Sequence, residues 1–148
     1  MVKENAVRDT VALLQECDSG TKMAVKSIRQ VLDNTASEKL NALLSHSLQE
    51  HEKLGNDLHA LLNEYGEPDK EPPVMGTISS WVTTSMKMMV NNTDQQIATL
   101  MTDGCHMGIK SLSKYVTQYK DASSQALDMC TRLIKIEQDL TDKLRVFL

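Results

Sequence analysis

The stretch that decides the fold is residues 40–66, LNALLSHSLQEHEKLGNDLHALLNEYG. Its apolar side chains recur at alternating steps of four and three residues, which places them on one face of an α-helix. Ser37 precedes this pattern in the position of a helix N-cap, and Gly66 ends it. The sequence therefore predicts a long amphipathic helix that buries one face. The expected inward stripe is Leu40, Leu44, Ser47, His51, Leu54, Leu58, Leu61 and Tyr65.

Three other segments repeat this spacing and predict three more long helices. They cover about residues 4–33, residues 93–119, which Asn92 or Thr93 would cap, and residues 126–147. Lengths of this order suit a single helical bundle better than several small units. On the first of these helices the expected inward stripe is Val7, Val11, Leu14, Asp18, Thr21, Val25, Ile28 and Leu32.

The links between the helices predict their arrangement. Residues 34–37 and 120–123 are too few to cross a bundle, so each link joins antiparallel neighbours. Residues 66–92 contain the break GEPDKEPPVMG and then a short helix that we expect to begin after Thr77. Two hairpins joined by one long crossover are typical of the ferritin-like arrangement. We therefore expect an all-α, ferritin-like antiparallel four-helix bundle that forms one domain over residues 1–148.

Composition narrows the classes of function. The chain has 16 Lys and Arg against 20 Asp and Glu without a basic block, so no nucleic-acid footprint is visible. The N-terminus is charged and amphipathic, and no segment is apolar enough for a membrane span, which predicts a soluble cytoplasmic protein. Cys17, Cys105 and Cys130 show no C-x-x-C spacing and fit reduced thiols.

Four side chains interrupt the apolar stripes near the middle of their helices: Asp18, His51, Cys105 and Glu137. At a rise of about 1.5 Å per residue, their positions along the bundle agree to within about 4.5 Å. We therefore expect them to face one another in a single buried layer. A buried carboxylate without a partner is costly, so such groups should be paired, protonated, hydrated or bound to a metal.

Two interpretations of this layer remain open. In the first, Asp18, Glu50, His51 and Glu137 form a carboxylate and imidazole metal site for a cation such as iron, manganese or zinc. Cys105 would lie beside that site, and His46, one turn from Glu50, could join it. In the second, His51 forms a hydrogen bond or an ion pair with Asp18 or Glu137, which sets the register of the bundle.

The segment LMTDGCHMGIK, residues 100–110, contains a different candidate pair. Asp103 and His106 have the i, i+3 spacing that one helix uses when it supplies two metal ligands. On a helical projection, however, both fall opposite the apolar stripe of their helix. We expect them to face solvent, as we expect of His59 on the second helix.

The predicted short helix carries Trp81, Met86 and Met89. Tryptophan and methionine side chains can form an adaptable surface for a protein partner or a lipid. Only one lysine accompanies them, so the favoured interpretation is packing over the end of the bundle. Docking of a partner on this surface is the alternative.

Two stretches carry a resemblance to a known superfamily. IATLMTDGCHMGIKSLSKYV, residues 97–116, is similar to a segment of a bacterial branch of the ferritin-like superfamily whose members have no known function. LLQECDSG, residues 13–20, resembles the first-helix segment that supplies an acidic ligand in metal-binding relatives. The branch usually has glutamate at the position of Cys105. Diiron members carry Glu-x-x-His on two helices, whereas here Glu50 and Glu137 are followed by lysine and leucine at that spacing.

The first hypothesis for function is a non-catalytic or degenerate ferritin-like bundle that acts through association, as a homodimer. The resemblance alone implies a bacterial stress or spore-related setting. The alternative is a metal-binding protein or oxidase that uses iron or manganese in the polar layer. No P-loop, dinucleotide fingerprint or nucleophile elbow occurs, so the sequence indicates no catalytic residue for phosphoryl, hydride or acyl transfer.

Overall fold

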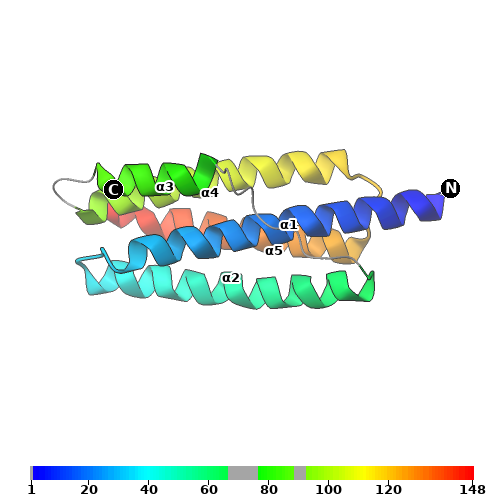
Figure 1. Cartoon of the computed structure of the whole chain (residues 1–148), viewed down its shortest axis with the longest axis horizontal. Coiled ribbons are helices and arrows are strands. Elements are labelled where there is room, and N and C mark those ends of the chain that lie inside the picture. The colour runs from blue at the N-terminus through cyan, green and yellow to red at the C-terminus, as the bar shows by residue number, and fades with distance from the viewer. Residues whose placement is uncertain (1, 67–76, 89–92) are drawn as a thin grey trace.

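The computed structural model describes residues 2–66, 77–88 and 93–148, and at residues 2–3 and 77–81 it describes the backbone alone. The described chain consists of helices and contains no strand. Figure 1 shows four long helices lying side by side, with one short helix at one end of the bundle. The helices are α1 (Val2–Leu32), α2 (Glu38–Glu64), α3 (Thr77–Lys87), α4 (Thr93–Gln118) and α5 (Ser124–Leu144), followed by the 3-10 turn η1 (Arg145–Phe147).

Local sequence explains where α2 and α5 begin and where α2 ends. The Ser37 side chain accepts hydrogen bonds from the N–H groups of Lys39 and Leu40, as a helix N-cap does. Gly66 has a φ of +68°, a conformation that only glycine adopts without strain, so the chain leaves the helix there. Ser123 caps α5 by accepting from the N–H of Ala126. The predicted limits of these helices are therefore confirmed to within a few residues.

The topology is an all-α bundle of two antiparallel hairpins joined by a crossover. The helices α1 and α2 form one hairpin, and α4 and α5 form the other. Figure 1 shows that α2 ends at the opposite end of the bundle from the start of α4. Within each hairpin the helices pack closely, whereas α1 and α4 approach each other less along their length. That difference leaves one side of the bundle more open.

Hydrogen bonds tie the hairpins together at both ends of the α1–α4 side. At one end the Asp94 carboxylate, on α4, accepts from the N–H groups of Ala36 and Ser37 in the α1–α2 link, at 2.8 and 2.9 Å. At the other end Asp9 and Thr10, on α1, accept from backbone N–H groups in the α4–α5 link, at 3.2 and 2.8 Å. The two helices are therefore held at both ends of their shared length.

The start of α1 differs from the predicted stripe. Val7 is 47 % exposed, whereas Asp9 and Thr10 are buried. Figure 1 shows the first turns of α1 extending past the end of the bundle, where no other long helix covers them. The next turn of α1 faces the α4–α5 link, whose backbone N–H groups donate to Asp9 and Thr10.

The helix α3 packs against α1 and α4. Val82 is fully buried, and Met86 is partly buried against the core that α1, α2, α4 and α5 share. Gln30 on α1 also donates to the hydroxyl of Thr83 at 3.2 Å. Packing over the bundle therefore accounts for Met86. Of the other two residues of the predicted interaction surface, Met89 and the side chain of Trp81 lie outside the described parts.

Within the described residues, no helix is both long enough and apolar enough to cross a bilayer.

Candidate functional site

The four side chains expected in a central layer are all buried. Their relative exposures are 2 % for Asp18, 1 % for His51, 8 % for Cys105 and 6 % for Glu137. They come from four different helices, α1, α2, α4 and α5. The predicted inward orientation of all four side chains is therefore confirmed.

The four predicted metal ligands do not converge on one point. Asp18 forms an ion pair with Lys22 one turn later on α1, at 3.2 Å. Glu50 is half-buried and lies 3.4 Å from the ring of His46, which is exposed. In the part of the chain that the structure describes, no three His, Cys, Asp or Glu side chains are grouped so that they could hold a metal ion. The predicted set is thus divided, because local partners on α1 and α2 engage two of its carboxylates.

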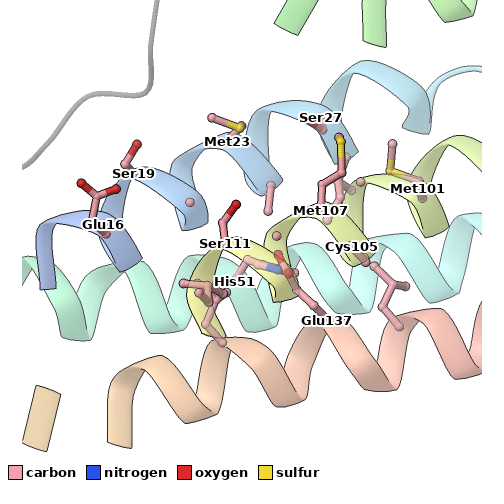
Figure 2. A pocket seen from close by; sticks show the side chains of 18 of the residues that line it. Glu16, Ser19, Met23, Ser27, His51, Met101, Cys105, Met107, Ser111 and Glu137 are labelled. Carbon is pink, nitrogen blue, oxygen red and sulfur yellow. The ribbon is translucent and has the colours of Figure 1, made fainter. Parts of the chain in front are cut away.

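The other two members of the set, His51 and Glu137, line one cavity. It has a volume of about 340 Å³ and lies between α1 and α4, with contributions from α2 and α5. Figure 2 shows His51 and Glu137 on the inner side, while Met23 and Ser27 of α1 and Met101 and Met107 of α4 surround the space. Cys105 also lines it. The cavity therefore combines a mainly apolar wall with a few polar groups at its inner side.

Small residues on both helices make room for this cavity. On α1 they are Gly20, Ala24 and Ser27, and on α4 they are Gly104, Gly108 and Ser111. Both sets follow the spacing i, i+4, i+7, which places their members on one helix face. Small residues often let two helices pack tightly. Here, hydrogen bonds hold α1 and α4 in place at both ends of their shared length, and the cavity lies between these ends.

His51 presents one defined nitrogen atom to the cavity. Its Nδ1 lies 2.7 Å from the backbone carbonyl oxygen of Ser47, which can only accept, so Nδ1 carries the proton. The Nε2 atom is buried and has no hydrogen-bond partner. Burial lowers the pKa of His51, against smaller opposing effects of the Ser47 carbonyl and Glu50. The ring is therefore neutral at pH 7, with Nε2 as an acceptor.

Glu137 is the second polar group at the inner side. Its Oε2 atom is buried without a hydrogen-bond partner. Burial raises the pKa of this carboxyl group to about 8, so it is mostly protonated at pH 7. The carboxyl lies against Gly108 of α4, where a Cβ atom would collide with Oε2. Glycine at this position thus lets an uncharged carboxyl group rest directly on the α4 backbone.

Cys105 completes the inner wall as a thiol. Burial, and to a lesser degree the neighbouring Glu137 carboxyl, raise the pKa of Cys105 well above its usual range. A thiol with a raised pKa is a weak nucleophile, because the thiolate is the reactive form. Cys105 therefore contributes a small, weakly polar surface to the cavity.

The D-x-x-H pair of α4 lies outside this site. Asp103 and His106 are both exposed, as their position on the helical projection predicts. His59 is exposed as well. These residues therefore add nothing to the cavity.

Sequence reasoning missed the cavity, although a pattern for it was present. The matching small residues of α1 and α4 mark two faces that meet, but their spacing is equally that of a close helix contact. Neither Gly108 nor Ala24 carries a polar or reactive side-chain group that would indicate a binding site. Only the tertiary structure shows that the two faces leave a space between them.

Comparisons with known proteins support the fold alone. No family model and no curated protein matches the chain. Among solved structures, the chain is similar to the crystal structure of a DUF305 fragment from Deinococcus radiodurans, with a TM-score of 0.73 and 14 % sequence identity over 93 % of each chain. At this identity the likeness shows that both proteins have the same all-α bundle arrangement.

Proposed function

We propose that this chain is a non-catalytic bundle protein, ferritin-like in fold, that holds a small and largely apolar ligand between α1 and α4. The observation that supports this proposal is a cavity of about 340 Å³ lined by His51 and Glu137, whose Nε2 and Oε2 atoms are buried without hydrogen-bond partners. Sites for small molecules are commonly apolar clefts of roughly 300 to 1,000 Å³ with a few convergent polar groups.

The cost of the two unpartnered atoms favours a binding role. A buried donor or acceptor without a hydrogen bond costs about 1–3 kcal/mol. A ligand that supplies the missing hydrogen bonds recovers part of this free energy on binding. The methionine side chains of the wall can adapt to its shape, because Met has three rotatable side-chain bonds.

The same groups argue against covalent catalysis in the cavity. Cys105 has a raised pKa, and burial lowers the pKa of His51, which makes its Nε2 atom a weak base. A catalytic cysteine needs a lowered pKa or a base within reach to form the thiolate. Binding without chemical conversion therefore agrees best with the state of these residues.

Metal binding stays the alternative, and one observation favours it. A metal-binding histidine typically donates one ring N–H to a carbonyl or carboxylate and coordinates the metal with the other nitrogen. His51 has this arrangement, and Glu137, which lines the same cavity, could supply a second ligand. Iron or manganese content, measured by elemental analysis after anaerobic purification, tests it. If the wild type contains stoichiometric metal and a His51→Ala, Glu137→Ala variant does not, the function is metal binding rather than binding of an apolar ligand.

The decisive test of ligand binding fills the cavity. Ala24 lines it on α1, and Ala60 is an exposed alanine on α2 that provides a matched control. Nile red, an uncharged dye that fluoresces in apolar surroundings, serves as the probe. We expect saturable binding to the wild type and to Ala60→Phe, and at least about tenfold weaker binding to Ala24→Phe because the phenyl ring occupies the space. Equal binding to all three proteins would refute the proposal.

The homodimer and the cytoplasmic location remain predictions from the sequence. Sedimentation of the purified protein would measure the oligomeric state directly.

A further inference from the structure

The polar groups of the cavity also define which ligand chemistry it accepts. Resting on the proposed function, we propose that the cavity selects ligands that end in an uncharged hydroxyl group, an alcohol or a phenol, which bonds to both His51 and Glu137. Figure 2 shows these two side chains reaching the space from α2 and α5, while Met23 of α1 and Met107 of α4 lie on its other sides. The selection follows from what each of the two atoms can donate or accept.

His51 can only accept at this site. Its proton is on Nδ1, where the carbonyl of Ser47 accepts it at 2.7 Å. The free Nε2 lone pair therefore requires a donor from the ligand. An ester, an ether or a ketone has no such donor and would leave Nε2 unpaired.

Glu137 supplies the complementary group. In the described residues no Lys or Arg lies within ion-pairing distance of its carboxyl, and Glu137 is 6 % exposed, so the uncharged form is favoured. A protonated carboxyl donates one hydrogen bond and accepts others. A hydroxyl group has one donor and two lone pairs, so it can donate to Nε2 of His51 and accept from Glu137 at the same time. It also reproduces the hydrogen bonds that a water molecule would make there.

Charged end groups fit less well. A carboxylate has no proton for His51, and no described cation of the cavity wall would balance its charge. An ammonium group could donate to both side chains, but its charge would be buried without a counter-ion unless Glu137 lost its proton. A hydrocarbon end leaves both polar atoms unpaired. The hydroxyl is thus the end group that satisfies the two atoms in the protonation states they hold.

The test uses four probes with the same carbon skeleton: 4-butylbenzyl alcohol, 4-butylbenzylamine, 4-butylbenzoate and 4-butyltoluene. Each competes with Nile red for the wild-type protein at pH 7. Because one net hydrogen bond is worth about 0.5–1.5 kcal/mol, the alcohol should bind roughly 2- to 13-fold more tightly than 4-butyltoluene. The benzoate and the amine should bind more weakly than the alcohol.

Two variants of Glu137 and one control locate the effect. Glu137→Met removes one of the two hydrogen-bonding groups, so the preference for the alcohol over 4-butyltoluene should fall, although Nε2 of His51 can still accept. Glu137→Gln restores a donor and an acceptor, so it should recover most of that preference. Gln138→Met makes a similar change at an exposed position of the same helix and should leave the wild-type ranking.

The possible outcomes separate this inference from the proposed function. Suppose that Nile red binds the wild type and binds Ala24→Phe more weakly. If the alcohol then has no advantage, or if Glu137→Met retains the full advantage, the cavity binds ligands but does not select a hydroxyl group. If the amine binds more tightly than the other three probes and its binding releases a proton from the protein, the cavity selects cations and the hydroxyl selection is wrong. If Nile red does not bind in the cavity at all, both proposals fall together.

Discussion

The carboxyl group of Glu137 on α5 occupies the place next to Gly108 on α4 where any other residue would carry its Cβ atom. A Cβ built on Gly108 would collide with Oε2 and lie 3.1 Å from Cδ of Glu137. This contact fills the α4 side of the inner cavity wall with an uncharged polar group. Through this contact, the face of small residues on α4 determines where the carboxyl group of Glu137 lies.

Replacement of Gly108 by alanine should move this carboxyl group. Because the colliding atoms are the end of a flexible side chain beside a cavity, the carboxyl can turn into the space at little cost. Alanine also favours the helix by about 1 kcal/mol. We expect Gly108→Ala to keep its stability to denaturant within about 1 kcal/mol of wild type but to bind Nile red several-fold more weakly.

Gly55→Ala provides the control for this substitution. A Cβ at Gly55 would meet only Cγ2 of Thr21, at an ordinary contact distance of 3.5 Å. This variant should gain about 0.5–1 kcal/mol of stability and keep the wild-type affinity for Nile red. If Gly108→Ala bound the dye as Gly55→Ala does, the carboxyl would not border the ligand.

Stability should fall as the pH rises from 4.5 to about 8 because of Glu137. Its pKa rises from 4.5 in the unfolded chain to about 8 in the fold, so the folded state binds more protons between these values. The stability that this group contributes is complete below pH 4.5 and is lost as the pH rises through 8. The other ionisable groups that face the cavity are Glu16, His51, Cys105 and Tyr115.

Glu137→Gln should remove this pH dependence. Relative to wild type, the variant should become more stable between pH 5 and 9, by up to about a few kcal/mol, because it has no proton to lose. Urea unfolding at several pH values measures the difference. Parallel pH profiles for the two proteins would show that Glu137 is ionised in the fold at neutral pH.

His51 should produce the opposite dependence on the acid side. Burial lowers its pKa below 6.5, so its contribution to stability is present above pH 6.5 and is lost as the pH falls toward the lowered value. We expect His51→Gln to show a flatter stability profile between about pH 6.5 and pH 5. His106→Gln, at an exposed position, should leave the slope unchanged.

Asp94 should be important for the register of the two hairpins. Its carboxylate accepts from the N–H groups of Ala36 and Ser37, which belong to the link between α1 and α2. Asp94→Ala should lower the free energy of unfolding by about 1–3 kcal/mol, because two charge-assisted hydrogen bonds are lost. Asp103→Ala, an exposed change on the same helix, should stay within about 0.5 kcal/mol of wild type. Similar losses in both variants would contradict the role of Asp94.

Much of the fold was predictable because local chemistry determines it. The stripe from Leu40 to Leu61 and the Ser37 cap predict α2 from short-range spacing and hydrogen bonding alone. Link lengths then predict which helices are neighbours. The exposed Val7 shows the limit of this reasoning, because a stripe does not reveal where the partner helices end.

For the site, the sequence predicted which side chains face inward but not which of them meet. Asp18 and His51 are both buried, yet Asp18 forms an ion pair with Lys22, whereas His51 lines the cavity. The protonation of Glu137 likewise depends on the absence of a nearby cation among the described residues, which no linear pattern reveals.

The amino-acid sequence by itself determined the helices, their order and their buried faces, because periodicity, caps and link lengths act over a few residues. The tertiary structure alone decided that the faces of α1 and α4 enclose a cavity rather than touch. That outcome depends on how far apart two helices are held by contacts at both ends, and this distance is a property of the packed bundle.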